Sequence, residues 1–508
     1  MKRFLIFLLI VAMVLPVAVA CGKTDDMSVD QTTATEQTTT AATEATTTVA
    51  QTNEYEIGDA MPENLNFDGK EITILSRGRD WCKDEISVNE INGELVNDAI
   101  FNRNVAVETR LNVKIVNHMI AGTGDYEIVD LMRTQVPSGS SDYDVIVGPA
   151  YADLSGVPNN LYQNLLEIEH LDLSRPYWAQ GFNEAMTIGE GQYLSTGAAC
   201  LSFYRFVFAT FFNKDMFDEN NVPYLYDAVK DGTWTLDRQA EVSQVFYSDV
   251  NGNGKSDSDD VFGFALNHDE IGVDPYWAAF ELPILTKDAD NFLVFAPDVE
   301  RLTNAIGKLN DFVWGSQSVY RVLSYGSDDE QSDLAKMFSE DTAAMTTLRL
   351  IEVESEYLRN MTSLYGIVPM PKFDETQTAY HSHVHDNVSA FSVPLTTAGD
   401  DLTLVGAVME SMAAESYRLV MPAYFELALK AKYVSDEESV QMLDLVIDSL
   451  RVDAGFLFVD DTAQFHQSMR KKWIGVNNSD VASVVKSLER VAQKQITNLN
   501  KSIEKNQD

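Results

Sequence analysis

Glu71-Ile72-Thr73-Ile74-Leu75 is the stretch from which the fold can be argued, because it predicts a β-strand that two further stretches repeat. The repeats are Leu111–Ile115 and Tyr143–Gly148, and a segment with apolar residues at helical spacing separates each strand from the next. Strands that alternate with helices at this spacing predict an α/β lobe built on a largely parallel sheet. The folded part of the chain is expected to start near Asn66.

The loops that follow these strands are the first places to look for a ligand site. In an open α/β sheet, ligands bind in the crevice outside the carboxyl ends of the strands. The loop after the first strand contains Asp80 and Trp81, and the loop after the third strand contains Tyr151. These three side chains are therefore candidate ligand-binding residues.

The composition excludes several classes of protein. The 508 residues are 45% hydrophobic and 23% charged, which argues against disorder throughout the chain and against a multi-span membrane protein. Asp and Glu outnumber Lys and Arg by 78 to 37, and the formal net charge is −41. Because so negative a surface repels phosphate backbones, we expect no nucleic-acid partner, whereas a neutral or cationic ligand is compatible with it.

The start of the chain predicts export. Met1-Lys2-Arg3 is basic, residues 4–20 are uncharged and apolar, and Ala18-Val19-Ala20 places small residues before Cys21. This order is typical of a bacterial lipoprotein signal peptide over residues 1–20, with Cys21 acylated as the mature N-terminus. An uncleaved membrane anchor and a plain secretory signal remain open. All three alternatives place the protein outside the cell, and the first anchors it by lipid to the outer face of the membrane.

A tether is expected between this anchor and the folded body. Threonine makes up half of Gln31–Thr52, and residues 21–55 contain almost nothing apolar. Such a stretch buries too little surface to offset the entropy lost on ordering, so it should remain extended. Its expected role is to hold the folded body clear of the membrane.

The sequence leaves open the roles of two groups of reactive side chains. Cys82 and Cys200 are the only cysteines after Cys21, and their pairing cannot be read from the sequence. His381, His383 and His385 would share one face of a strand, and the His-x-His spacing occurs in metal sites. Zinc binding, a ligand contact and a purely structural role are the alternatives for these histidines.

Five motifs in order carry a resemblance to a known family. They are Asn92–Ile100, Tyr143–Ile146, Phe211–Phe217, Gly232–Asp237 and Tyr365–Lys372. In this order, behind a lipoprotein signal, the chain resembles the extracellular solute-binding proteins of bacterial ABC importers, family 1-like and of the carbohydrate type. The resemblance covers nearly all of residues 66–500.

The resemblance implies two α/β lobes in a periplasmic-binding-protein-like fold, joined by crossing strands and closing on a ligand. Lobe one would comprise residues 66–197 and 374–428, and lobe two would comprise residues 208–364 and 435–508. The crossings would fall near residues 198–208, 365–373 and 428–434. A monomer that works with ABC permease subunits is also implied.

A calcium loop is the most specific motif in the chain. Oxygen-bearing side chains occupy loop positions 1, 3, 5, 9 and 12 and Gly254 occupies position 6, as in an EF-hand-type loop. The candidate ligands are Asp249, Asn251, Asn253, Lys255 through its carbonyl, Asp257 and Asp260. Position 12 is aspartate where EF-hands use glutamate. The alternatives are a structural Ca²⁺ site and a polar, turn-rich loop that binds nothing.

Aromatic side chains give the last set of candidates. Carbohydrate-binding sites stack sugar rings on Trp or Tyr and surround them with polar groups. Besides Trp81 and Tyr151, loop or crossing positions hold Trp178, Tyr204, Trp277 and Trp314, and the resemblance adds Arg349. For each single residue, packing in the core is the alternative, and Trp234 is assigned to helix packing.

Catalytic motifs are lacking in the sequence: there is no Gly-x-Ser-x-Gly, His-Glu-x-x-His, phosphate loop or Gly-x-Gly-x-x-Gly. We therefore expect a lipid-anchored protein that captures an extracellular carbohydrate, with an oligosaccharide as the expected ligand, for import. A secreted carbohydrate-active enzyme and a glycan-binding surface protein without a transport role are the alternatives.

Overall fold

The computed structural model describes residues 55–120, 124–140, 142–322, 330–425 and 437–507. The chain divides into two compact units, Met1–Thr52 and Asn53–Asp508, and every described residue belongs to the second. The predicted signal peptide, Cys21, the tether up to residue 54 and the predicted third crossing at residues 428–434 lie outside the described residues. None of the described helices is both long and apolar enough to cross a membrane.

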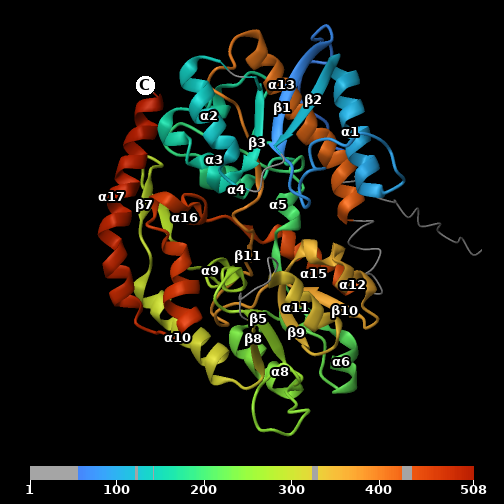
Figure 1. Ribbon diagram of the computed structural model, residues 1–508, viewed down its shortest axis with the longest axis vertical. Helices are drawn as coiled ribbons and strands as arrows, with labels where there is room; N and C mark the ends of the chain where they lie inside the picture. The colour runs from blue at the N-terminus through green and yellow to red at the C-terminus, as the bar shows by residue number, and fades with distance from the viewer. Residues whose placement is uncertain (1–54, 121–123, 141, 323–329, 426–436, 508) are drawn as a thin grey trace, which may run out of the picture. The chain divides into compact units, whose positions relative to one another are not determined.

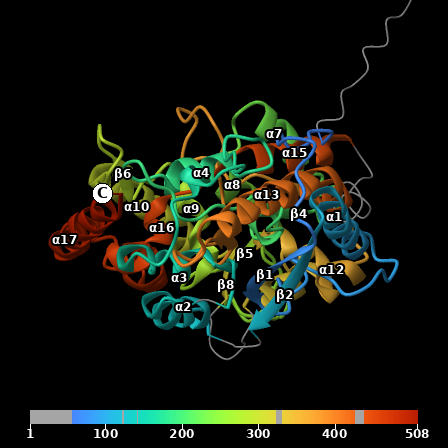
Figure 2. The ribbon, with the colours of Figure 1, turned by 90° about the horizontal axis from the view of Figure 1, so that it is seen from above.

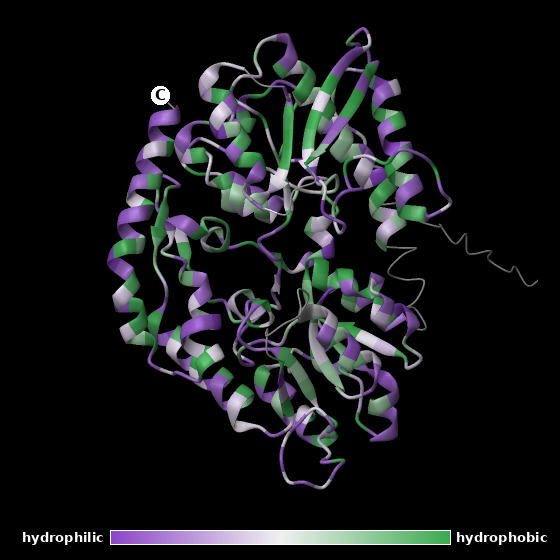
Figure 3. Ribbon diagram, viewed as in Figure 1, coloured by the Kyte–Doolittle hydropathy of each residue, from purple (hydrophilic) through white to green (hydrophobic). Residues whose placement is uncertain are grey.

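A four-stranded sheet forms the core of the first lobe, in the order β12-β3-β1-β2 (Figure 1). The three predicted strands are all present and parallel to one another, while β12 runs antiparallel to β3. Their bounds are β1 Lys70–Arg77, β2 Val113–Ile120, β3 Val145–Pro149 and β12 Ser389–Ser392. All five residues of β3 are buried, and Figure 3 colours most of this strand as hydrophobic. The expected α/β lobe with a largely parallel sheet is confirmed.

Helices cover this sheet and connect its strands. The main ones are α1 Leu95–Leu111, α2 Glu127–Ser138, α3 Ala150–Leu154, α4 Gln180–Met186, α5 Ser202–Arg205 and α13 Asp400–Glu415. Helix α1 begins where the side chain of Glu94 accepts a hydrogen bond from the Asn97 amide. It ends at Asn112, which takes a left-handed conformation (φ 49°) and donates its N–H to the Glu108 carbonyl. This tight ending lets the chain enter β2 at once.

A five-stranded sheet forms the core of the second lobe, in the order β10-β4-β9-β5-β8. Its strands are β4 Phe208–Asn213, β5 Phe264–Asn267, β8 Val319–Val322, β9 Met345–Arg349 and β10 Tyr365–Val368. Strands β5, β8 and β9 are parallel, and β4 is antiparallel to both of its neighbours. The helices around it are α6 Lys214–Glu219, α7 Tyr226–Lys230, α8 Leu236–Phe246, α9 Pro275–Ala279, α10 Val299–Gly315, α11 Glu330–Ser339, α12 Glu356–Asn360 and α15 Glu437–Asp448.

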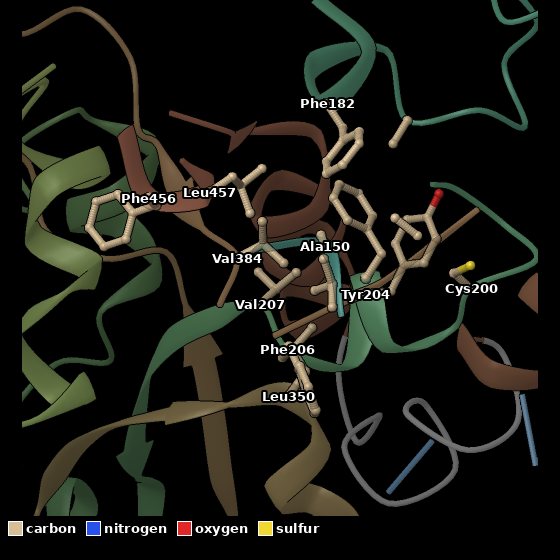
Figure 4. Packing of buried hydrophobic residues seen from close by; sticks show 14 of the residues in the cluster. Ala150, Phe182, Cys200, Tyr204, Phe206, Val207, Leu350, Val384, Phe456 and Leu457 are labelled. Carbon is tan, nitrogen blue, oxygen red and sulfur yellow. The ribbon is translucent and has the colours of Figure 1, made fainter. Parts of the chain in front are cut away.

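Two chain segments pass between the sheets side by side. Val207 and Val384 form an antiparallel bridge, and the His385 amide donates to the Phe206 carbonyl at 3.1 Å. Figure 4 shows Val207 next to Val384, with Phe206 and Leu350 packed beside them. The first passage falls within the predicted region 198–208.

The second passage lies later in the chain than predicted. Residues 365–373 stay with the second lobe, because β10 pairs with β4 and Lys372 exchanges backbone hydrogen bonds with Trp234 and Leu236. Gln377 also remains there and donates to the Ala279 carbonyl at 2.8 Å. The chain reaches the first sheet only after residues 381–388. The prediction was wrong because an edge strand rich in apolar residues looks the same as a crossing strand in the sequence.

The C-terminal part contacts elements of both lobes. Short elements come first: β11 Ser382–His383 pairs with β13 Leu450–Arg451, and α16 Ala454–Leu457 follows. Helix α17, Val481–Gln507, lies alongside α10 in both views (Figure 1, Figure 2) and also contacts the hairpin strand β7, Leu293–Phe295. Its far end reaches the first lobe, where Asn506 donates to the Val157 carbonyl at 3.0 Å. Residues 435–508 are therefore not confined to the second lobe.

Both cysteines within the described residues are unpaired. Cys82 and Cys200 are buried, and burial raises the pKa of the Cys82 thiol to about 12. The question that the sequence left open is thus answered in favour of two separate buried thiols. A thiol with so high a pKa holds almost no thiolate near neutral pH, so Cys82 is expected to react slowly.

Candidate functional site

The carboxyl ends of β1, β2 and β3 meet at one edge of the first sheet. Since the three strands are parallel, Arg77, Ile120 and Pro149 end side by side. A small hollow at this edge is lined by Arg77, Arg79, Ile120, Gly124, Asp125, Glu127, Ile128 and Pro149. This is the crevice position at which open α/β sheets bind their ligands.

Asp125 is the polar centre of this edge. Its Oδ1 lies 2.8 Å from Arg79 Nη2, and its Oδ2 accepts a hydrogen bond from the Tyr151 hydroxyl at 2.7 Å. The side chains of Arg79 and Asp125 are only 30% and 25% exposed. One carboxylate thus holds a guanidinium and a phenol in fixed positions while all three groups retain access to solvent. Such charge-assisted groups are suited to binding hydroxyl groups.

Trp81 and Arg349 meet at the ring of Phe206. The Trp81 ring lies 4.9 Å from that of Phe206, with the planes inclined at 56°, and the Arg77 guanidinium lies 4.5 Å from the Trp81 ring centre. From the second lobe, the Arg349 guanidinium lies 5.1 Å from the Phe206 ring centre and pairs with Glu352 at 2.8 Å. Arg349 ends β9, so both lobes contribute to this group.

Two acidic residues from late in the chain lie near the side chains at this sheet edge. The Tyr126 hydroxyl lies 3.4 Å from Asp460 Oδ2, and its ring is 5.7 Å from that of Tyr151 in an edge-on arrangement. Asp386 follows the second passage, and burial raises its pKa to about 7 although the nearby Arg470 opposes the shift. We call Arg79, Trp81, Asp125, Tyr126, Tyr151, Phe206, Arg349, Asp386 and Asp460 the strand-end cluster.

The other predicted ligand-binding residues lie elsewhere. The side chain of Asp80 is 94% exposed and pairs with Lys83. Trp178 is buried and donates its Nε1–H to Glu410 at 3.1 Å, so it belongs to the core of the first lobe. Tyr204 is buried against Phe203 and Phe425.

Trp314 and Trp277 belong to the second lobe. Trp314 donates to the Ile474 carbonyl at 2.8 Å and lies near His268, just beyond the carboxyl end of β5. Trp277 is buried in an aromatic group with Phe456, Phe465 and Trp473. Within the part of the chain that the structure describes, neither residue makes a hydrogen bond or ring contact to the strand-end cluster. Trp234 is fully buried, in line with its assignment to packing.

Sequence reasoning missed several members of the cluster, and for some of them a signal was present. Asp125 and Tyr126 lie five and six residues after the end of β2, so the rule applied to the loops after β1 and β3 would have found them if it had been applied to β2. Asp386 stands next to His385, in a motif for which a ligand contact is one of the alternatives, but the candidates there are the histidines and not Asp386. Asp460 carried no signal, because its position depends on how the C-terminal segment folds back.

The predicted calcium loop forms a compact turn. Asp249 accepts hydrogen bonds from the amides of Gly252, Asn253 and Gly254, and both glycines have φ of 69°. Asp257 and Asp260 lie on the returning side, where Asp260 is fully buried and accepts from the Val250 amide at 3.1 Å. Within the described residues, no group of three or more His, Cys, Asp or Glu side chains is arranged to hold a metal ion. Calcium binding therefore stays a prediction.

The three histidines do not converge on one point. His381 Nε2 lies 3.1 Å from Glu281 Oε1. His383 is buried against Phe208 and Phe456, and burial lowers its pKa to about 3. His385 accepts a hydrogen bond from the Asn387 amide at 3.2 Å. Phe208 packs against both His383 and His385, but within the described residues no group of three or more His, Cys, Asp or Glu side chains is arranged to hold a metal ion, so structural roles suit these histidines better than a shared zinc ion.

Asp153 beside the cluster predicts a pH dependence of stability. It lies in α3 directly after β3, is fully buried, and neither carboxylate oxygen has a hydrogen-bond partner among the described residues. Burial raises its pKa to about 8, against about 3.9 in an unfolded chain. At pH values between these two pKa values, the folded state therefore binds one proton more than the unfolded state. Protonation of Asp153 thus stabilises the folded state. The stabilisation is complete below about pH 4 and is lost as the pH rises through 8.

We expect the free energy of unfolding to fall by as much as about 1.4 kcal/mol per pH unit between pH 5 and 7 through this group. Asp153→Asn removes the titration, so the difference in stability between the variant and the wild type should change with pH by that slope. Denaturant titrations at pH 5, 6 and 7 measure it. A constant difference across the range would show that Asp153 titrates normally.

Comparisons with known proteins identify the fold. No protein-family model and no curated protein matches the sequence. Among solved structures, M. tuberculosis UspC matches at 13% identity with a TM-score of 0.54, covering 84% of this chain and all of that one. The galacto-N-biose/lacto-N-biose I-binding protein of the ABC transporter from Bifidobacterium longum, in complex with lacto-N-biose, matches at 14% identity and 0.54, covering 85% of this chain and 98% of that one. A cyclo/maltodextrin-binding protein complexed with maltotetraose matches at 10% identity and 0.50, covering 86% and 97%.

The chain therefore has the α/β fold of ABC-transporter solute-binding proteins, as the sequence motifs predicted. Nearly the full length of each of these structures is matched, so the likeness extends over both lobes.

Proposed function

We propose that this protein is a lipid-anchored substrate-binding protein that captures an extracellular carbohydrate and delivers it to an ABC permease. The observation that carries the proposal is the strand-end cluster, where Trp81 and Phe206 lie beside the Arg79–Asp125–Tyr151 network. The half-buried Trp81 ring can receive an apolar C–H face of a sugar, while the buried Phe206 ring packs against Trp81, and the hydroxyl groups of a sugar fit the charged donors and acceptors.

The ligand is expected to be an oligosaccharide. Polar and aromatic groups are contributed by the first lobe through Trp81 and Tyr151, by the second lobe through Arg349, and by the C-terminal segment through Asp460. An oligosaccharide offers several rings and many hydroxyl groups that could contact groups from these three parts of the chain. Groups from both lobes around one ligand also suit closure of the lobes on binding.

Anchoring by lipid rests on the sequence around Cys21, and its role here is to keep the binding protein close to a membrane permease. A formal net charge of −41 suits a neutral sugar better than an anionic ligand. The permease is a proposed partner of the folded body, and the protein is expected to act as a monomer.

A binding protein captures its carbohydrate without cleaving it, and this distinguishes the proposed function from that of a carbohydrate-active enzyme. Asp386 has a pKa near 7, a property that a hydrolase would use in an acid catalyst, so hydrolysis has to be measured directly. The purified chain should retain a bound oligosaccharide unchanged, with no new reducing ends after prolonged incubation. Catalytic release of reducing ends that Asp386→Asn abolishes would identify an enzyme instead.

Calcium is proposed to stabilise the loop from Asp249 to Asp260. The carboxylates of Asp249, Asp257 and Asp260 repel one another in a short loop, and a divalent cation relieves this repulsion. Even a site with Kd near 10⁻⁴ M is largely filled at extracellular calcium levels. Tenfold excess over Kd adds about 1.4 kcal/mol to stability.

We expect a chelator to lower the melting temperature, calcium to restore it, and magnesium to restore it poorly. Asp249→Ala combined with Asp257→Ala should abolish the shift, which differential scanning calorimetry measures. The affinity for sugar should change much less than stability, because no residue of this loop belongs to the strand-end cluster. If the chelator does not change the melting curve of the wild type, the loop is a polar turn that binds no calcium.

A further inference from the structure

The C-terminal helix α17 presents a row of basic side chains to solvent. An α-helix turns by about 100° per residue, so side chains four residues apart lie nearly in line along it. The buried residues Val485, Ile496 and Ile503 lie on the side of α17 that faces the core. Five exposed basic residues fall within one arc of about 100° on the opposite side, and we call them the basic stripe: Lys486, Arg490, Lys494, Lys501 and Lys505.

The basic stripe has no acidic partner in the described part of the chain. None of its five side chains forms an ion pair or a hydrogen bond with another described residue. Glu504 shares this face of α17, and Glu489, at the border of the face, accepts a hydrogen bond from Gln493 at 3.1 Å. The stripe extends over about 28 Å of helix, at a rise of about 1.5 Å per residue. A chain with a formal net charge of −41 thus exposes a row that is predominantly positive.

The surroundings of the stripe limit the shape of a partner. Helix α10 and the hairpin strand β7 contact α17, and exposed acidic side chains lie on these elements or just before them: Asp288, Asp290, Asp298, Glu300 and Asp311. Because charges more than about 8 Å apart are largely screened at physiological ionic strength, a single narrow chain on the stripe meets mainly the basic groups. A flat anionic membrane or a wide nucleic-acid duplex would also meet the neighbouring carboxylates.

A linear anionic polymer matches both the charge and the shape of the stripe. Helix α17 lies at the outer edge of the molecule in Figure 1 and Figure 2, so its solvent side is accessible. Stripe residues one turn apart are separated by about 6 Å along the helix axis, and lysine and arginine make charge-assisted hydrogen bonds to anionic groups. An extended polymer with closely spaced charges can therefore contact several of them at once. We propose that the basic stripe binds a linear polyanion, at a surface separate from the strand-end cluster. Only the place of this polymer outside the cell rests on the proposed function.

Fluorescence anisotropy with labelled long-chain inorganic polyphosphate tests this proposal. The wild type should bind the polymer saturably at low salt, and Arg490→Glu combined with Lys494→Glu should weaken binding more than tenfold. Both side chains are exposed, and glutamate has a helix propensity close to that of arginine and lysine, so the variant should fold. Inorganic phosphate, which offers one anionic group at a time, should not compete.

The salt dependence of binding gives a second measurement. For single-stranded nucleic acids, the logarithm of the affinity falls with the logarithm of the salt concentration by about 0.7 per phosphate neutralised. Five contacts predict a slope of about −3.5 for the wild type, and the three contacts left in the double variant predict about −2.

Lys70→Glu combined with Lys114→Glu is the matched control. It changes the net charge by the same amount, and both lysines are exposed, on β1 and β2, which lie away from α17 in both views. This control and Trp81→Ala should bind polyphosphate as the wild type does.

Absence of polyphosphate binding would overturn the proposal, as would equal weakening in the control, which would show that only the overall charge matters. Binding to phosphatidylglycerol vesicles but not to polyphosphate would assign the stripe to a membrane surface and also overturn it. These outcomes are independent of whether a carbohydrate binds the strand-end cluster.

Discussion

Trp81→Ala is expected to weaken the binding of the protein's oligosaccharide ligand ten- to a hundredfold. The ring of Trp81 is half-buried, with the Arg77 guanidinium 4.5 Å from its centre and the Phe206 ring 4.9 Å away. Loss of a stacked ring removes about 1–3 kcal/mol of burial and contact from the complex, which corresponds to that change in affinity. Calorimetry on variants that remain folded measures it.

Trp178→Ala is the matched control for this prediction. Trp178 is buried, donates to Glu410 and packs against Phe391, so its loss should lower stability while the affinity of the folded protein stays nearly the same. Native affinity in Trp81→Ala would remove this residue from the site. A loss of affinity in Trp178→Ala as large as that in Trp81→Ala would show that the effect is indirect.

Asp274→Ala is expected to lower the free energy of unfolding by about 3–5 kcal/mol, the cost of leaving a buried charge without its partner. Asp274 is 1% exposed, and its carboxylate accepts from Nε of Arg470 at 2.8 Å and makes a second contact to Nη2. Arg470, itself 10% exposed, would keep Glu270 at 3.6 Å and the more distant charge of Asp386, but no close, doubly hydrogen-bonded carboxylate. This pair links the start of α9 to the C-terminal segment, so chemical denaturation should show the loss clearly.

Glu71→Ala serves as the comparison for the ion pair. Glu71 and Lys114 pair at 2.9 Å with side chains 54% and 66% exposed, and such surface pairs contribute between 0 and about 1 kcal/mol. If Asp274→Ala costs no more than Glu71→Ala, the Asp274–Arg470 pair does not stabilise the fold in the way described.

Much of the fold could be predicted because its signals are local. Apolar runs such as Ile72–Leu75 predict strands from a few neighbouring residues, and their alternation with helices indicates a parallel sheet. The rule that ligands sit beyond strand ends then led to Trp81 and Tyr151, which are both members of the cluster. Arg349 was found only through the family resemblance.

The remaining features depend on distant parts of the chain. Trp178 and Trp277 looked like ligand-stacking residues, but the structure buries both against segments more than 100 residues away. The sequence around Tyr365–Val368 gives no sign of which sheet the strand joins, since this is decided by its pairing with β4. Asp460 and Phe206 meet the cluster only after the C-terminal segment and the first passage have folded into place.

Screening the purified chain on a glycan array tests the central claim most directly. We expect saturable retention of at least one soluble oligosaccharide, with strongly reduced retention by Trp81→Ala. Retention by Asp80→Ala should be unchanged, because the side chain of Asp80 is almost fully exposed. Folded wild-type protein that retains no glycan would contradict the claim that the strand-end cluster is a carbohydrate site.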